Sequence, residues 1–391
     1  MPDLNPARPW NRRRLLTTGA TGLGVLLGGR LLVACGSDDK GSSRTTAASA
    51  TTASTGTMGG SATTSAATSA SSTPAATADV SIAMGWIKNV EYAGSWVALE
   101  NGYYDDQGIK PAYQQGGPNA PAAPVAVAAG SAQIGVSASM LTLLDAINEG
   151  NDFVVFGTQY QVSPGAVLSL PKKPVKTPQD LVGITFLGQE GVDVNINAVL
   201  DIAGLPHDYK FVVAGFTPDP LLEGQGDAYS CFLVNQPITL ETKGMVEGTD
   251  FIVTTWADLG FPSYANLFFA ERKYVESNRD DIVRFMRATI KGWETNAEDP
   301  TIGAKLAVDE YGADLGLDLT QQTRQNELQI PLMKSVLTDS SGLFRIDPAQ
   351  WNGPMKAAYL AAGRTTMPAL DDAVDLTILD DVFEGKTTLL S

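Results

Sequence analysis

The stretch VSIAMGWIKNVEYAGSWVALENGYYDDQGIKPAYQ, residues 80–114, decides the fold. Residues 80–86 form a short apolar run that predicts a strand, 94–101 predict a helix, and 109–114 predict a second strand. A strand, a helix and a strand in this order are typical of a parallel β-sheet with helices on its faces. An α/β fold requires the same alternation to continue along the chain.

The alternation does continue, and it restarts once. Before residue 160 it predicts helices at 120–129 and 140–149 and strands at 133–136 and 152–158. After 177–181, TPQDL, it predicts strands at 184–187, 210–213 and 228–232 and helices at 192–203 and 218–224. From about residue 260 the chain is mainly helical, at 280–293, 301–311 and 321–337. We therefore predict an α/β protein of two lobes, each with a parallel-type sheet, and a ligand cleft between the lobes.

The predicted organisation has five segments. They are an export signal with a lipidation motif at 1–35, a disordered tether at 36–78, the first part of lobe 1 at 79–170, lobe 2 at 171–262, and a return to lobe 1 with C-terminal helices at 263–391.

The first segment combines a basic start with an apolar run. Arg12, Arg13 and Arg14 precede the apolar residues 15–33, and the segment closes on Leu-Val-Ala-Cys at 32–35. This ending resembles a bacterial lipobox, in which the Cys is lipidated, and RRRLL at 12–16 also resembles a twin-arginine export signal. A membrane-spanning helix is the alternative, but the run is short and rich in Gly and Thr. We expect Cys35 to anchor an exported protein to the outer face of the cytoplasmic membrane.

Composition excludes several functional classes. From residue 79 onward the chain has 20 Lys and Arg against 40 Asp and Glu, which argues against nucleic acid and against docking on anionic lipid. Cys231 would be unpaired if Cys35 is lipidated, and His207 is the single His. The chain therefore has too few His and Cys residues for a zinc site or for Cys–His catalysis, and its single His leaves little basis for a Ser–His–Asp triad. We predict no metal and no cofactor.

Several motifs in order resemble one family of binding proteins. They are W-x-x-N-x-x-x-x-G from Trp86, VALENGYY at 97–104, VAAGSAQIG at 127–135, LEGQGDA at 222–228, and GLFRID at 342–347 followed by Trp351. This series resembles solute-binding proteins for the thiamine pyrimidine precursor and, more broadly, the nitrate/sulfonate/taurine-binding group, over roughly 79–385. The resemblance implies a periplasmic-binding-protein-like fold, and as partners an ABC permease and its ATPase. We expect a monomer.

The same resemblance extends to an enzyme, the eukaryotic-type thiamine pyrimidine synthase. That enzyme uses a Lys that binds pyridoxal phosphate, a His that it consumes, and a cysteine-rich run. At the matching positions this chain has Ser137, Leu141 and the run FPSYAN at 261–266. A serine cannot form the Schiff base that pyridoxal phosphate needs, so we predict a binding protein with no catalytic residue.

The candidate ligand-binding residues follow predicted strands. In lobe 1, Trp86 offers a flat face and Asn89 a donor and an acceptor, with the aromatic Tyr92 behind them. Alternatively, Trp86 is core and Asn89 a turn residue. Four more residues end later strands of the same lobe: Ser137, Ser139, Gln159 and Tyr160. Ser139 could instead be a plain helix N-cap.

Lobe 2 contributes fewer candidates. Gln189 and Glu190 lie between a strand and a helix in GQEG, which could also be only a tight turn, and Asn235 follows the strand at 228–232. No Arg occurs between residues 79 and 271, although Arg often clamps sulfonates and carboxylates. We therefore expect a neutral, planar nitrogenous ligand such as a thiamine pyrimidine precursor or a flavin. An alkylsulfonate, nitrate or taurine receptor and a ligand sensor are the alternatives.

Overall fold

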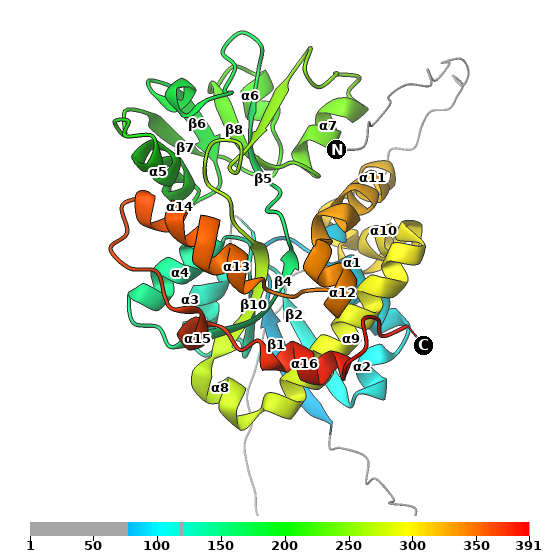
Figure 1. The fold of residues 1–391 in the computed structure, drawn as a ribbon. Coiled ribbons are helices and arrows are strands. Elements are labelled where there is room, and N and C mark those ends of the chain that lie inside the picture. Colours follow the sequence, from blue (N-terminus) through cyan, green and yellow to red (C-terminus); the bar gives the residue numbers. More distant parts are fainter. Residues whose placement is uncertain (1–76, 118–119, 391) are drawn as a thin grey trace, which may run out of the picture. The chain divides into compact units, whose positions relative to one another are not determined.

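The computed structural model describes residues 77–117 and 120–390. The predicted export signal, Cys35 and residues 36–76 of the predicted tether lie outside this range. In the described part the chain forms two five-stranded sheets, one in each of two lobes, with helices around them (Figure 1).

The first sheet has the order β2-β1-β3-β10-β4. Its strands are β1 (Ala78–Ala83), β2 (Ile109–Gln114), β3 (Ile134–Ser137), β4 (Phe153–Tyr160) and β10 (Ala265–Glu271). β1 pairs in parallel with β2 and β3, as the strand–helix–strand pattern of residues 80–114 predicted. β10 runs antiparallel to both β3 and β4.

The second sheet has the order β7-β6-β8-β5-β9. Its strands are β5 (Gly165–Ser169), β6 (Thr185–Gly188), β7 (Lys210–Val213), β8 (Ala228–Phe232) and β9 (Ile252–Thr255). β6 pairs in parallel with β7 and β8, whereas β5 runs antiparallel to β8 and β9.

Both sheets are mixed, so the prediction of parallel-type sheets was wrong in part. The antiparallel members β5 and β10 each follow a segment that crosses from one lobe to the other (Figure 1). A strand that enters directly from the other sheet needs no covering helix and need not run parallel to its neighbours. β5 also lies inside the range predicted for lobe 1, 79–170, so the first change of sheet falls between Tyr160 and Gly165.

Helices cover the sheets and continue the chain to its C-terminus. They are η1 (Val90–Tyr92), α1 (Ala93–Glu100), α2 (Tyr103–Asp106), α3 (Ala123–Ala128), α4 (Met140–Asn148), η2 (Pro178–Leu181), α5 (Asp193–Ile202), α6 (Asp219–Leu222), α7 (Gln236–Thr242), α8 (Arg272–Ser277), α9 (Arg279–Glu298), α10 (Pro300–Leu306), η3 (Ala307–Tyr311), η4 (Ala313–Leu315), α11 (Leu319–Gln329), η5 (Ile330–Met333), α12 (Val336–Ser341), α13 (Pro348–Gln350), η6 (Trp351–Met355), α14 (Lys356–Ala361), α15 (Leu370–Ala373) and α16 (Thr377–Phe383). The single helix predicted at 321–337 is divided, because Pro331 lies within it and Ser335 caps a new helix.

Two glycines bring α1 and α9 into close contact. A Cβ atom on Gly94 would lie 2.2 Å from Trp293 Cγ, and one on Gly292 would lie 2.0 Å from the Gly94 carbonyl oxygen. Only glycine fits at such a crossing. Because α1 begins directly after η1, this contact also fixes the turn at residues 89–92.

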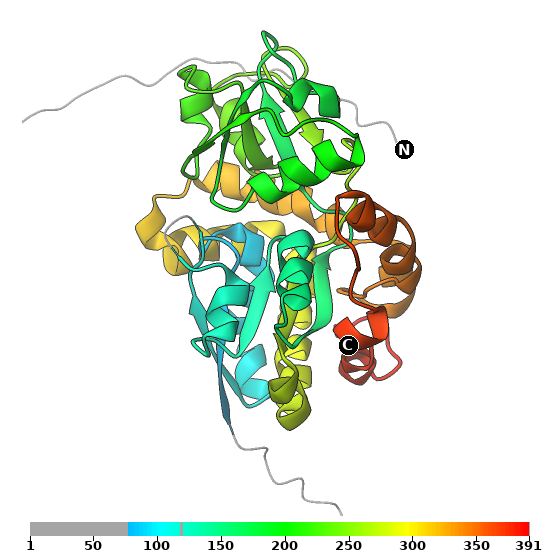
Figure 2. The same ribbon diagram turned by 90° about the vertical axis from the view of Figure 1, so that its left-hand side faces the viewer.

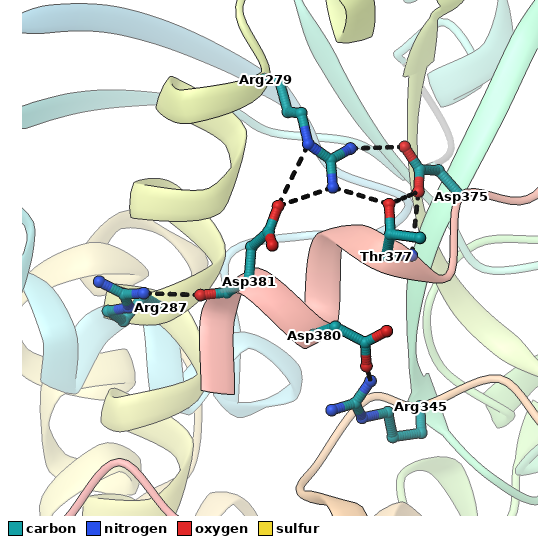
Figure 3. A network of polar contacts seen from close by, with 7 residues as sticks. All are labelled: Arg279, Arg287, Arg345, Asp375, Thr377, Asp380 and Asp381. Carbon is teal, nitrogen blue, oxygen red and sulfur yellow. Dashed lines mark hydrogen bonds and ion pairs between the residues drawn. The ribbon is translucent and has the colours of Figure 1, made fainter. Parts of the chain in front are cut away.

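The C-terminal segment protects the edge of the first sheet. Val374 forms a bridge with Val155 of the edge strand β4, and the Asp375 N–H donates to the Val155 carbonyl at 2.9 Å. Arg279 of α9 holds this segment by ion pairs to Asp375, at 2.6 Å, and to Asp381, at 2.8 Å (Figure 3). At Val155, therefore, the edge strand already has a partner and cannot pair with a second chain.

Candidate functional site

A cavity of about 490 Å³ lies where strands of both sheets end. The carboxyl ends of β1, β3, β6 and β8 all contribute to it, as expected for ligand sites in α/β folds. In the ribbon view, α11 lies between the two lobes (Figure 2). Six predicted residues line the cavity: Trp86, Ser137, Ser139, Gln189, Glu190 and Asn235.

The lobe 1 wall begins with Trp86. Its ring is half-buried and meets Phe216 of lobe 2 edge to face, with 5.8 Å between the ring centroids. Ser137 donates its hydroxyl to the Ser139 carbonyl at 2.9 Å, and the Ser139 hydroxyl accepts the Thr142 N–H as the N-cap of α4. Ser139 therefore caps a helix and borders the cavity at the same time.

The lobe 2 wall is organised by Gln189. Its amide nitrogen donates to the Gly215 carbonyl at 3.0 Å and to the Tyr229 hydroxyl at 2.9 Å, and its amide oxygen accepts from Ser230 at 2.6 Å. Three internal partners make this side chain a fixed part of the wall. Glu190 is exposed, and Asn235 accepts from Gln321 of α11.

Four predicted residues lie behind the cavity wall, and their side chains already have partners. The Asn89 carboxamide accepts the Glu91 N–H at 3.0 Å, and the Tyr92 hydroxyl accepts the Trp86 N–H at 3.0 Å. Gln159 donates to the Glu91 carbonyl at 2.9 Å, and Tyr160 donates to Gln329 at 2.7 Å. The alternative that Asn89 is a turn residue agrees with this geometry, and Tyr92 holds the backbone of Trp86 in place.

Glu91 was not predicted, although it lines the cavity. Only 1% of its surface is exposed, and its carboxylate oxygen accepts from Asn266 at 3.0 Å. Burial raises the pKa of this carboxyl to about 7, against the lowering effect of the hydrogen bonds from Asn266 and Tyr92. The sequence did offer a clue to this site residue, because Glu91 is a carboxylate that lies inside the W-x-x-N-x-x-x-x-G motif, between Asn89 and Tyr92.

Other wall residues were also missed. Trp256 follows β9 and is buried at the cavity, and residues 120–125 form part of the lobe 1 side. The strand before Trp256 was not predicted, and residues 120–125 were predicted only as the start of the helix at 120–129, so neither segment was considered for the site. Cys231, predicted to be unpaired, is a free thiol buried in the wall, and burial raises its pKa.

The described part of the cavity wall has carboxyl groups but no basic side chain. Within the described residues, the lining includes Glu91 and Glu190 but no Lys, Arg or His. The same part of the chain contains no group of three His, Cys, Asp or Glu side chains placed to hold a metal ion. None of its helices is long and apolar enough to cross a membrane.

The positions that matter to the related enzyme have clear structural roles. Ser137 lies in the cavity wall, Leu141 is buried in the core, and Phe261 and Tyr264 are buried in the segment that returns to lobe 1. The Tyr264 hydroxyl accepts the Asp347 N–H at 2.9 Å. At these positions, which the sequence resemblance matches to the reactive groups of the synthase, this chain has side chains that pack or form hydrogen bonds.

Comparison with known proteins identifies relatives. The model of the family described as NMT1/THI5 like matches residues 89–302. The formylaminopyrimidine-binding protein of Halalkalibacterium halodurans is 24% identical over 286 residues, which cover 71% of this chain and 80% of that protein. The riboflavin-binding protein RibY of Chloroflexus aurantiacus is 26% identical over 278 residues, covering 70% and 78%.

A solved structure confirms the fold. The alkanesulfonate-binding protein SsuA of Xanthomonas axonopodis pv. citri superposes with a TM-score of 0.55 and 17% identity, covering 77% of this chain and 99% of that one. At this identity the likeness shows the fold alone. The predicted two-lobe α/β fold of periplasmic binding proteins is therefore confirmed.

Proposed function

This chain belongs to the NMT1/THI5-like family, and from that premise we propose that it is the solute-binding protein of an ABC importer. It takes up a small molecule outside the cytoplasm and delivers it to a permease that works with a separate ATPase. Relatives that bind formylaminopyrimidine and riboflavin support this assignment. A cavity of about 490 Å³ is within the usual range for one small ligand.

The absence of basic side chains from the described cavity wall is the observation that best supports a neutral ligand. Sulfonate, nitrate and carboxylate ligands lose their hydration on binding and are often held by cationic side chains, which the described wall does not offer. Trp86 and Trp256 offer flat apolar faces, and the serine, glutamine and asparagine side chains offer hydrogen bonds. The ligand is therefore a neutral, planar nitrogen heterocycle, of the aminopyrimidine or flavin type.

The protein acts by binding and not by catalysis. Ser137 stands where the related synthase has the lysine that holds its cofactor, so no imine can form there. The leader and the motif ending at Cys35 support export and lipid anchoring at the outer face of the cytoplasmic membrane, with the twin-arginine route favoured by residues 12–16.

Calorimetry on the purified protein tests the ligand class. The titrants are formylaminopyrimidine, riboflavin, an alkanesulfonate and nitrate. We expect saturable binding of one of the two heterocycles, and a ligand at 100 times its Kd should stabilise the fold by about 2.7 kcal/mol. Tight binding of the sulfonate or nitrate alone would assign the protein to the alternative ligand class.

A further inference from the structure

Glu91 is a buried carboxyl group for which the described chain offers no cation. It takes part in no ion pair among the described residues, and the donors beside its side chain are neutral: the Asn266 amide at 3.0 Å and the Tyr92 hydroxyl. Burying a charged group without a partner costs free energy, so the carboxyl group either stays neutral or pairs with a group that the chain itself does not supply. A structural role alone would be served equally well by glutamine.

The surroundings of Glu91 are neutral on every side. Tyr92 on η1 and Tyr160 on β4 stay protonated, because burial and then the nearby Glu91 charge raise the pKa of each hydroxyl. β10 contributes the amide of Asn266. On α11, Arg324 and Glu327 pair with each other at 3.5 Å on an exposed face. No fixed charge therefore favours the ionised form of Glu91.

Asn266 is unusual in two ways. Its backbone has φ = 53°, a left-handed conformation that is uncommon outside glycine. Its carboxamide nitrogen faces Glu91 Oε1 at 3.0 Å and Gln159 Oε1 at 3.4 Å, while its buried Oδ1 atom has no partner in the described chain. Strain and an unpaired polar atom at the same residue are typical of functional sites.

We propose that Glu91, as a neutral carboxylic acid, binds the polar edge of the ligand in the cavity. A carboxylic acid offers one O–H donor beside one carbonyl acceptor. That pair complements a ring edge with an adjacent acceptor and N–H donor, which both an aminopyrimidine and the imide of a flavin present. Glu91 would then select neutral heterocycles and reject anions. This inference rests on the proposed function.

A pH dependence of binding follows from this role. Ligand binds the protonated form, so Glu91 must take up a proton when it is ionised in the free protein. With a free pKa of about 7, affinity should be nearly constant below pH 6 and about tenfold weaker at pH 8 than at pH 6. A carboxylate that bound a cationic ligand would show the opposite trend.

The test compares Glu91→Gln, which keeps a donor beside an acceptor, with Glu91→Leu, which keeps neither. Calorimetry with formylaminopyrimidine and riboflavin at pH 6 and pH 8, in two buffers of different ionisation enthalpy, gives the affinity and the proton uptake. We expect the parent to take up close to one proton at pH 8. Glu91→Gln should take up none through this group, with an affinity that does not fall at pH 8. Glu91→Leu should bind at least tenfold more weakly than the parent at pH 6.

Glu294→Gln is the matched control, because Glu294 is a half-buried carboxyl with a raised pKa, caused by burial, that accepts from Leu389 and Leu390 away from the cavity. It should leave affinity and proton uptake unchanged. If the parent binds a heterocycle but its affinity and proton uptake match those of Glu91→Gln at both pH values, the role of Glu91 is wrong while the proposed function stands. If the parent binds neither heterocycle, the ligand class itself is wrong and the role of Glu91 falls with it.

A measurement without ligand checks the buried acid independently. Between pH 4.5 and 7 the folded chain binds more protons at Glu91 than the unfolded chain does, so ionisation destabilises the fold progressively as pH rises. The melting temperature of the parent should therefore fall relative to Glu91→Gln across that window, and the gap should stay constant above it. A constant gap across the whole range would mean that the carboxyl is ionised throughout, which overturns the proposal.

Discussion

At the scale of single residues, side chains divide into those that face the cavity and those that hold the wall. Trp86 faces the cavity, whereas Asn89 and Tyr92, three and six positions later, are used by the backbone of the same turn. Residues of one motif thus have different roles at the site, and the motif alone does not show which side chains face the cavity.

Replacing Trp86 should affect binding directly. Trp86→Ala removes both apolar contact and an aromatic face, which adds about 0.5–1.5 kcal/mol beyond burial. We expect at least about tenfold weaker binding of the cognate heterocycle, roughly 1.4 kcal/mol, measured by calorimetry. Trp86→Phe should retain most of the affinity. Unchanged binding by a folded Trp86→Ala protein would mean that the ring serves only to pack against Phe216.

At the scale of elements, two helices are held to their neighbours by polar contacts, and one of them connects the two lobes. The buried face of α11 is polar: Gln322 accepts the Val90 N–H at 2.8 Å, Gln329 donates to the Val90 carbonyl at 2.8 Å, and Gln321 reaches Asn235 of lobe 2 at 3.2 Å. This helix therefore ties the turn before α1 to the opposite wall of the cavity. The second helix, α16, is fastened to α9 by Arg279.

The Arg279 cluster should stabilise the C-terminal segment. Partial burial opposes ionisation of Asp375, but Thr377 and the Arg279 guanidinium together hold its pKa below the ordinary value (Figure 3). We expect Arg279→Met to lower the free energy of unfolding by about 1–2 kcal/mol, measured by urea denaturation. The loss should shrink in acid, as the pH falls through the lowered pKa of Asp375, because the protonated acid gains nothing from Arg279.

Lys305→Met provides the matched control, because Lys305 pairs with Asp309 on an exposed helical surface. It should change stability far less than Arg279→Met does. Equal effects of the two substitutions would show that the network in Figure 3 contributes no more than a surface ion pair.

At the scale of the whole molecule, charge and anchoring bear on where the protein works. The acidic excess from residue 79 onward favours solubility. The proposed lipid anchor at Cys35 would hold the binding domain beside a permease in the same membrane.

Anchoring can be tested at Cys35. Cys35→Ser removes the thiol that would carry the lipid, so we expect the protein to leave the membrane fraction or to remain unprocessed, as seen by fractionation and mass spectrometry. Cys231→Ser is the control, since that thiol is buried in the fold. Correctly processed Cys35→Ser protein that stayed in the membrane would contradict the lipid anchor.

The sequence by itself determined the elements that depend on local pattern. The alternation in residues 80–114 predicted β1, α1 and β2 and their parallel pairing, because apolar spacing and turn residues act over short distances. The same logic placed Trp86, Ser137 and Gln189 at strand ends that meet in the cavity. The motifs in order predicted the family.

Only the tertiary structure decided the rest. β5 and β10 run antiparallel because the chain crosses between lobes before each of them, and strand direction after a crossing leaves no mark in local sequence. Glu91 and Trp256 come together from positions 165 residues apart, and the burial that raises the pKa of Glu91 to about 7 comes from neighbours on β4, β10 and α11. Local pattern fixes which residues form an element, whereas burial, and with it the chemistry of a carboxyl group, depends on what the completed fold packs around it.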